Sequence, residues 1–318
     1  MLHCRLRREY EPAALLANHP PVFTHPHKRL VFELACPAGA VHHGPVRLTR
    51  WSAAALPSSV TLASTEVLSA PGYYDYAGPD AGVWHVNFAD PRLFVAYGSA
   101  LLAQDELQAV EHPLLGCLRE ALLAEQQPAL TVDAEGPTPV LVAGVERRCA
   151  LATERGLYGN RFARASADEV RRALRIIQPP TRSNLIAIAA SVGKPGPYFP
   201  RQIETTLVTA FTGFSAAVQE SQRMWPGATC EIRTGFWGCG AFGGNRELMT
   251  LLQLLAARLA GVSRVRFYVF DAAGEADFQA GVAALEEVLT EGSAGEPLAD
   301  LLARIDDRDY EWGVGDGN

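Results

Sequence analysis

The stretch TGFWGCGAFGGNRELMTLLQLLAARL, residues 234–259, connects a predicted strand to a predicted helix through a loop rich in glycine. Glycine has no Cβ, so such a loop turns sharply or lets another group come close to its backbone. Successive backbone N–H groups at the start of a helix form a binding site for phosphate. Taken alone, the loop has two interpretations, a pocket for a phosphate-bearing ligand and a tight buried turn.

Two familiar nucleotide-binding motifs do not fit this loop. The letters GCGAFG at 238–243 satisfy G-x-G-x-x-G, the dinucleotide fingerprint. That fingerprint opens its domain, whereas only about 45 residues follow Asp271 here, and their pattern predicts a helix and a tail. A Walker loop is excluded because no Lys-Ser/Thr pair follows the glycines.

Strand and helix patterns alternate on both sides of this loop. β-Forming apolar runs predict strands at 58–68, 82–89, 138–145, 184–190, 228–235 and 263–271. Helical periodicity predicts helices at 98–126 with a break near Pro113, 167–177, 198–220, 246–261 and 277–290, and a short helix in the tail. The alternation predicts an α/β protein with helices on both faces of a sheet.

The first 45 residues are rich in proline and histidine. They predict an N-terminal extension with one strand or turn, followed by a single domain over 46–318. The irregular spacing of His25, His27, His42 and His43 favours surface or packing roles over metal binding.

Composition narrows the function classes. With 48% hydrophobic and 20% charged residues, the 318-residue chain has enough apolar material for a substantial core. The net charge of -7 argues against general binding to nucleic acid or to a membrane surface. The six cysteines form no CxxC pair, so a zinc or disulfide framework is not expected, and no metal or cofactor is predicted. Without a secretory signal or a membrane span, the expectation is a soluble, cytoplasmic protein.

A second polar cluster lies well upstream of the glycine loop. Gln104, Asp105 and Glu106 follow an apolar segment near the start of a predicted helix. If that turn packs against the sheet, one carboxylate points into a pocket. The alternative is an ordinary charged helix turn.

Together these stretches resemble the catalytic domain of poly(ADP-ribose) glycohydrolases, which is a macrodomain. The segments VNFAD at 86–90 and QDE at 104–106 follow the family spacing, and TGFWGCGAFGGN at 234–245 nearly copies the family's TGNWGCGAFGGD. LYGNRF, NLIAIAA and YFPRQIETTLVTAFTGF, at 157–162, 184–190 and 198–214, resemble further family motifs. The resemblance covers roughly residues 60–271. It implies a three-layer α/β/α macrodomain with a central mixed sheet, and it shows no counterpart of the helical region that precedes the macrodomain in animal enzymes.

The resemblance also implies roles for matched positions. Glu106 corresponds to the acid that protonates the leaving oxygen, and Asp105 to the carboxylate that holds the distal ribose. Gln104 would form a wall near the adenine. The remaining substrate-binding positions are Asp90 at the ribose, Gly238, Cys239, Gly240, Ala241, Phe242 and Gly243 in the diphosphate loop, and Tyr158 and Phe270 beside the adenosine. Cys239 lacks a histidine at a recognisable spacing, which favours packing over a nucleophilic role.

The function that the resemblance implies is an ADP-ribose glycohydrolase. Its substrates would be poly- or mono-ADP-ribosylated protein or nucleic acid, without sequence-specific binding to nucleic acid. Two alternatives stay open: a macrodomain that binds ADP-ribose without cleaving it, and an immunity or partner protein directed against an ADP-ribosylating toxin.

Several positions depart from the family pattern. Phe94, Val95 and Ala96 replace three glycines, and their side chains are expected to obstruct or reshape the pocket near the distal ribose. Asp90 and Phe236 each replace an asparagine, and the central residue of Gln-Asp-Glu is shorter by one methylene. The altered 94–96 loop favours the two alternatives, whereas the retained Glu106 favours the enzyme.

Overall fold

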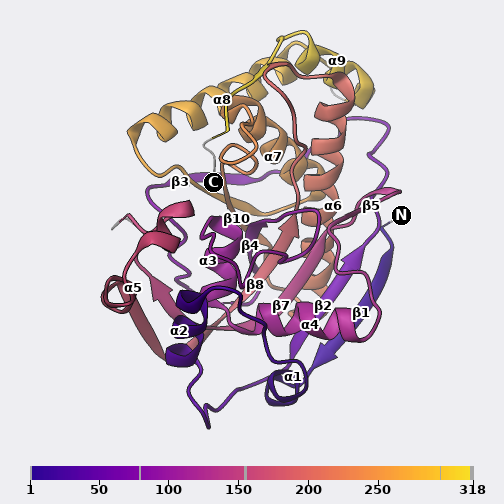
Figure 1. Cartoon of the computed structure of the whole chain (residues 1–318). Coiled ribbons are helices and arrows are strands. Elements are labelled where there is room, and N and C mark those ends of the chain that lie inside the picture. Colours follow the sequence, from indigo (N-terminus) through magenta and orange to yellow (C-terminus); the bar gives the residue numbers. More distant parts are fainter. Residues whose placement is uncertain (1, 79, 154–155, 294, 316–318) are drawn as a thin grey trace.

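A mixed eight-stranded sheet forms the centre of the protein (Figure 1). It is seen in a computed structural model that describes residues 2–78, 80–153, 156–293 and 295–315. The strand order is β1-β2-β7-β8-β4-β10-β11-β3. These strands are β1 (Cys4–Tyr10), β2 (Val46–Trp51), β3 (Glu66–Ala70), β4 (Val83–Phe88), β7 (Val140–Leu151), β8 (Leu174–Ile188), β10 (Glu231–Gly235) and β11 (Arg264–Tyr268). Two small ribbons pair β5 (Val132–Asp133) with β6 (Gly136–Pro137), and β9 (Gly196–Pro197) with β12 (Glu311–Trp312).

The sheet has a parallel half and an antiparallel half. In the parallel half each strand pairs with the next in the order β8-β4-β10-β11-β3. β1, β2 and β7 pair antiparallel, and β7 also pairs antiparallel with β8. The carboxyl ends of the parallel strands therefore meet at one edge of the sheet, which is where α/β proteins bind their ligands.

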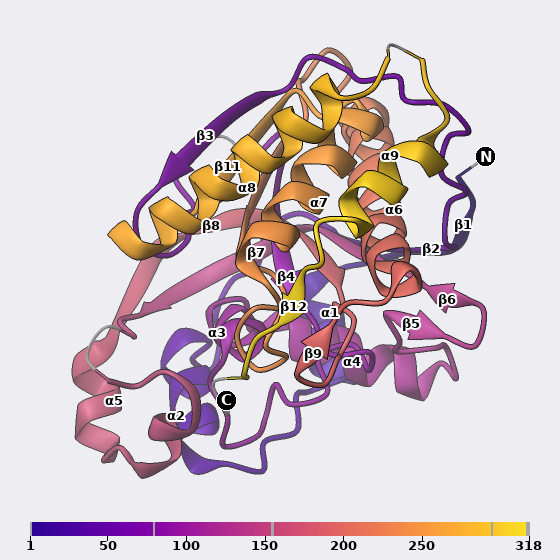
Figure 2. The ribbon, with the colours of Figure 1, turned by 90° about the horizontal axis from the view of Figure 1, so that it is seen from above.

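Helices cover both faces of the sheet (Figures 1 and 2). The described helices are α1 (Pro12–Asn18), α2 (Pro26–Ala35), α3 (Gln104–Glu111), α4 (Leu114–Ala124), α5 (Ala167–Ala173), α6 (Pro200–Met224), α7 (Arg246–Ala260), α8 (Ala272–Thr290) and α9 (Leu298–Asp306). α6 to α9 lie on one face, and α1 to α5 lie on the other. Alternate residues of β8 separate these layers, since Ile186 packs with the α6–α9 layer and Leu185 packs with α4. The expected three-layer α/β/α architecture with a mixed sheet is confirmed.

The N-terminal residues contribute more structure than the sequence predicts. Instead of one strand or turn, they form β1, which is the edge strand beside β2, and the helices α1 and α2. Each helix starts at a proline, a residue that suits the first helical position, and each is short enough to leave little periodicity in the sequence. His42 Nδ1 lies 2.7 Å from Glu146 Oε2, while His25 and His27 pack against Phe162.

The segment after α5 is a strand where a helix is predicted. The helix ends at Ala173, and β8 begins at once with Leu174 paired to Leu151 of β7. The long ladder with β7 overrides the helical propensity of 174–177 and extends both strands beyond the predicted ranges. Of the predicted strand 58–68, only 66–68 is regular, as the first part of β3. None of the helices within the described residues is long and apolar enough to cross a membrane.

Candidate active site

The glycine loop and the first turn of α3 face each other at the carboxyl ends of the parallel strands. They line a cavity of about 250 Å³. Its lining includes Asp90, Gln104, Asp105, Glu106, Tyr158, Gly238, Gly240, Ala241 and Phe242. The structure thus brings together segments that lie more than a hundred residues apart in the sequence. Cys239, Gly243 and Phe270 line an adjoining groove of about 690 Å³.

Gln104 connects the start of α3 to the end of β4. Its Oε1 accepts a hydrogen bond from Phe88 N at 2.7 Å, and its Nε2 donates to Val86 O at 3.1 Å. The side chain therefore hydrogen-bonds backbone groups of β4 that lie beyond the last residue paired with β10. Its amide is committed to the backbone, so Gln104 can form a wall of the cavity but has few donors and acceptors left for an adenine.

Asp105 and Glu106 are two adjacent carboxyl groups that are both buried. Glu106 Oε2 accepts a hydrogen bond from Ala103 N at 2.9 Å, as an N3 residue does at a helix start. Asp105 Oδ1 accepts from Asn87 Nδ2 at 3.1 Å. Burial, and then the charge of the neighbouring Glu106, raises the pKa of Asp105 well above its usual range. The Asp105 carboxyl therefore keeps its proton to a higher pH than an exposed aspartate does.

Lys28 of α2 is a cation near this pair that the sequence analysis missed. Its side chain is 1% exposed, and Nζ has no hydrogen-bond partner among the described residues. Nζ lies 5.6 Å from the centre of the Phe162 ring. Burial lowers the pKa of Lys28 to about 8, while the charges of Glu106 and Asp105 act to raise it. One signal was available, because Lys28 shares the buried face of α2 with Val31 and Ala35 at helical spacing.

The glycine loop presents its backbone to the cavity. Gly238 has φ +77°, and a Cβ there would lie 2.6 Å from Ala190 Cβ, so glycine is required on both counts. Within the described part of the chain, the amides of Gly240, Ala241 and Phe242 donate no hydrogen bond. Three consecutive unpaired donors just before α7 are suited to an anionic ligand.

The surroundings of the loop hold it in place. Trp237 is fully buried behind it, and its Nε1 donates to Ile188 O at 3.0 Å. The C-terminal tail packs on the other side, where Gly313 N donates to Gly243 O at 2.7 Å. Burial raises the pKa of the Cys239 thiol far above its usual range, so the thiol stays protonated and is a poor nucleophile.

An aromatic rim, defined as Tyr158, Tyr73 and Phe270, borders the groove beside the loop. Tyr73 lies between the other two rings, with ring centres 6.2 Å from Tyr158 and 5.0 Å from Phe270. Tyr73 and Phe270 are each 41% exposed, so their rings form an accessible aromatic surface beside the groove. The sequence analysis missed Tyr73, although its run of tyrosines, YYDY at 73–76, was a visible signal.

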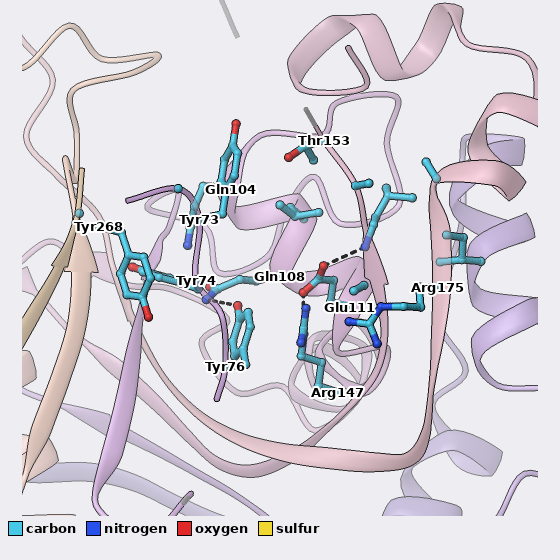
Figure 3. A pocket seen from close by; sticks show the side chains of 18 of the residues that line it. Tyr73, Tyr74, Tyr76, Gln104, Gln108, Glu111, Arg147, Thr153, Arg175 and Tyr268 are labelled. Carbon is cyan, nitrogen blue, oxygen red and sulfur yellow. Dashed lines mark hydrogen bonds and ion pairs between the residues drawn. The ribbon is translucent and has the colours of Figure 1, made fainter. Parts of the chain in front are cut away.

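A second cavity, of about 430 Å³, lies on the other side of Gln104 and Phe88. One stripe of α3 lines it, namely Gln104, Leu107, Gln108 and Glu111. Figure 3 shows Gln108 donating to the Tyr76 hydroxyl and Glu111 paired with Arg147, at 2.9 Å and 2.7 Å. Tyr73 and Phe270 line this cavity as well as the groove, so the two spaces adjoin at the aromatic rim.

The comparison with known families identifies the segment that carries the glycine loop. Residues 140–277 match the family model described as poly(ADP-ribose) glycohydrolase, Macro domain fold. These residues are similar to the macrodomain of that family, and the match covers less than half of the chain. The family is one of glycohydrolases, the enzyme class that the sequence predicts. The matched range includes the loop, Tyr158 and Phe270, and it begins after Asp105 and Glu106.

Bacterial poly(ADP-ribose) glycohydrolases are among the similar solved structures. One is the enzyme from Thermomonospora curvata bound to the inhibitor ADP-HPD, which is 16% identical over 88% of this chain and 85% of that chain, with a TM-score of 0.46. Another is the enzyme from Deinococcus radiodurans in complex with ADP-ribose, which is 13% identical over 88% and 94%, with a TM-score of 0.41. These likenesses are distant, and the fold assignment rests on the sheet order and layers described above.

The three residues that replace the glycines of the poly(ADP-ribose) glycohydrolase pattern do not fill the 250 Å³ cavity. Neither Phe94, Val95 nor Ala96 is among its lining residues, contrary to the expectation that they obstruct it. Phe94 is fully buried in the core beneath α4, and its φ of +50° is in the left-handed region that favours glycine. The backbone thus keeps a conformation suited to glycine while the side chain turns into the core.

Two further departures, at Asp90 and Phe236, are accommodated locally. Asp90 lines the cavity, is 38% exposed, and accepts a hydrogen bond from Arg92 N at 2.8 Å. Phe236 packs against Phe267 in the core, and the Arg246 guanidinium lies 4.8 Å from the centre of its ring. Phe236 faces the 690 Å³ groove and not the smaller cavity.

Proposed function

We propose that this protein is an ADP-ribose glycohydrolase that cleaves ribosyl bonds of poly- or mono-ADP-ribosylated substrates. The observation that carries the proposal is the 250 Å³ cavity, where buried Asp105 and Glu106 face a glycine loop with three unpaired amides. An anion-binding loop opposite a pair of carboxyl groups matches a substrate that has a diphosphate next to a ribose.

The two walls of the cavity bind different parts of the ligand. The amides of Gly240, Ala241 and Phe242 hold the diphosphate, and the aromatic rim holds the adenosine. The distal ribose then lies toward the first turn of α3, where Asp105 and Asp90 accept hydrogen bonds from its hydroxyl groups.

Glu106 carries the chemistry of bond cleavage. Its carboxyl group donates a proton to the leaving oxygen as the bond from that oxygen to the anomeric carbon breaks. A water molecule then attacks the anomeric carbon and returns a proton to the Glu106 carboxylate. The products are free ADP-ribose and the hydroxyl-bearing remainder of the substrate, and the enzyme recovers its starting state.

A raised pKa at Asp105 supports the binding role given to that residue. A neighbour that stays protonated at neutral pH limits the negative charge beside the diphosphate. It also leaves a carboxyl proton to donate to a ribose hydroxyl. The free thiols of all six cysteines are compatible with the reducing cytoplasm, which we propose as its location.

The alternative function is an ADP-ribose reader that does not cleave its ligand. One observation favours it, since Glu106 Oε2 is already engaged by the Ala103 amide. Catalysis requires Glu106 to release or share that hydrogen bond when it meets the leaving oxygen.

One paired experiment separates the enzyme from the reader. ADP-ribose binding is measured by calorimetry, and release of ADP-ribose is followed from poly- and mono-ADP-ribosylated substrates. For an enzyme, Glu106→Gln keeps ADP-ribose binding and lowers release by about 10²- to 10⁴-fold, the usual contribution of a general acid. Glu204→Gln, an exposed position on α6, is the matched control and releases at the wild-type rate. Wild-type binding without release establishes the reader, and absence of binding contradicts both functions.

A further inference from the structure

A group of exposed arginines surrounds the end of the second cavity that lies away from the active site. Arg172 and Arg175 line this 430 Å³ cavity, together with the buried pair of Arg147 and Glu111. Arg172 also lines a hollow of about 460 Å³ on the protein surface, where it is joined by Arg161 and Arg164. The four exposed arginines, Arg161, Arg164, Arg172 and Arg175, are called the arginine track below.

The arginine track is a local excess of positive charge on an acidic protein. The chain has a net charge of -7, yet residues 161–175 contain five arginines against two acidic residues. Arg171 pairs with Asp168 at 2.9 Å, whereas none of the four track residues forms an ion pair with any described residue. Their guanidinium groups are therefore available to an anion from solution.

Buried Arg147 does not belong to the track. Its Nε donates to Glu111 Oε2 at 2.7 Å, and its guanidinium lies 4.3 Å from the centre of the Tyr76 ring. Figure 3 shows this pair among the side chains that line the cavity, with Arg175 beside it. Because Glu111 balances its charge, Arg147 shapes the cavity, and the attraction for an anion comes from the exposed arginines.

The hollows form a continuous route from the active site to the track. The groove beside the glycine loop and the 430 Å³ cavity share Tyr73 and Phe270 of the aromatic rim. The 430 Å³ cavity in turn shares Arg172 with the surface hollow. A chain whose first diphosphate rests on the glycine loop, and whose adenosine rests on the rim, therefore continues toward the arginines.

We propose that the arginine track binds the diphosphate of the ADP-ribose unit that adjoins the unit held in the active site, on its adenosine side. Each such unit carries two phosphate groups, and guanidinium forks bind phosphate oxygens in pairs. The proposal rests on the proposed function and adds to it a second binding site, for the neighbouring unit of the chain. The preferred ligand is a chain of at least two ADP-ribose units.

Binding of defined ligands to the full-length chain tests this proposal. Glu106→Gln protein keeps oligomers intact, and it is titrated with ADP-ribose, with a two-unit ADP-ribose oligomer, and with a single-stranded RNA of equal charge. In this background we expect the two-unit oligomer to bind about tenfold more tightly than ADP-ribose at low salt. The reason is that its second diphosphate forms two exposed ion pairs with the arginine track. The advantage shrinks as salt rises.

Charge reversal at the track provides the decisive comparison. Arg172→Glu/Arg175→Glu removes the advantage of the oligomer and leaves the affinity for ADP-ribose unchanged. The neutral pair Arg161→Gln/Arg164→Gln reduces the advantage with less risk to folding, and thermal melting checks each variant. Arg201→Glu, an exposed arginine on α6 in the opposite layer, keeps the advantage and is the matched control.

The failures of the two proposals are distinguishable. Equal binding of one and two units, or an advantage that survives the charge reversal, overturns the arginine track while ADP-ribose binding leaves the proposed function intact. RNA that competes as well as the oligomer overturns the assignment to an ADP-ribose chain and indicates a general polyanion surface. If wild-type protein binds neither ADP-ribose nor the oligomer, both proposals fail.

Discussion

The glycine loop and the first turn of α3 line the same cavity, yet they contribute to it in opposite ways. The loop offers backbone amides and keeps side chains out of the way, while the turn offers two buried carboxyl groups. The shape of the loop depends on residues within it and directly behind it. The charge of the turn depends on burial by other elements and on Lys28 from α2. Backbone geometry is thus set locally, whereas electrostatics is set by residues far away in sequence.

Crowding the loop is expected to have the largest effect on ligand binding. In Gly238→Ala the new Cβ meets Ala190 Cβ at 2.6 Å, and the residue must also hold φ +77°. We expect ADP-ribose binding at least about tenfold weaker, with a loss of roughly 1–3 kcal/mol in the free energy of unfolding. Calorimetry and denaturant unfolding measure the two changes. Gly227→Ala carries similar strain at φ +87° with nothing within 4 Å, so it should lose some stability and no affinity.

Removing the buried cation tests the dependence of the α3 turn on distant residues. Burial lowers the pKa of Lys28 to about 8 from 10.5, so the unfolded chain holds that proton more tightly than the folded protein. Wild-type stability should therefore rise with pH between about 8 and 10.5, and Lys28→Met should lose this rise. At pH 7 the variant should be more stable, by up to about 3 kcal/mol, because each pKa unit corresponds to about 1.4 kcal/mol.

The other lysine of the chain provides the control for that experiment. Lys194 is exposed, so Lys194→Met should reproduce the wild-type dependence of unfolding free energy on pH. In Lys28→Met the pKa of Asp105 rises further, since the cation that lowers it is gone. The alkaline limb of the turnover profile should then move to higher pH. An unchanged alkaline limb would show that the charge of Lys28 does not affect the protonation of the reacting groups.

Trimming the aromatic rim should have a moderate effect. Tyr73→Ala removes the ring that connects Tyr158 and Phe270, and we expect ADP-ribose to bind about five- to tenfold more weakly, by roughly 1 kcal/mol for lost ring contacts. Phe199→Ala removes a ring that is still more exposed, at 65%, and that lies at the start of α6. Phe199 lines none of the hollows described above. This variant should bind as wild type does. An equal loss of ADP-ribose affinity in both variants would show that the aromatic rim is not part of the binding site.

The smallest effect is expected where the sequence comparison suggested a large one. Val95→Gly/Ala96→Gly restores two of the family glycines, but neither side chain lines the 250 Å³ cavity. Affinity for ADP-ribose and the rate of its release should change by less than about twofold, as for a substitution outside the binding contacts. A marked gain in activity would mean that these side chains do restrict the ligand.

The sequence predicted best those features that have a local physical cause. The strand–loop–helix around Gly238 and the break near Pro113 are visible because glycine and proline each constrain the backbone in a characteristic way. The prediction of a helix over 174–177 was wrong because pairing with β7, and not the segment's own propensity, makes it part of β8. Lys28 and Tyr73 were missed because their importance comes only from what folds against them. The expectation that Phe94 obstructs the pocket was wrong because a resemblance in sequence order does not say which way a side chain turns.

The contact between Gly313 and Gly243 has a consequence for how the protein is made. Synthesis proceeds from the N-terminus, so the glycine loop leaves the ribosome well before the tail that packs against it. During that interval the phosphate-binding loop lacks one of its supports. The loop therefore gains this support only after residues 311–315 have been synthesised and have packed against it.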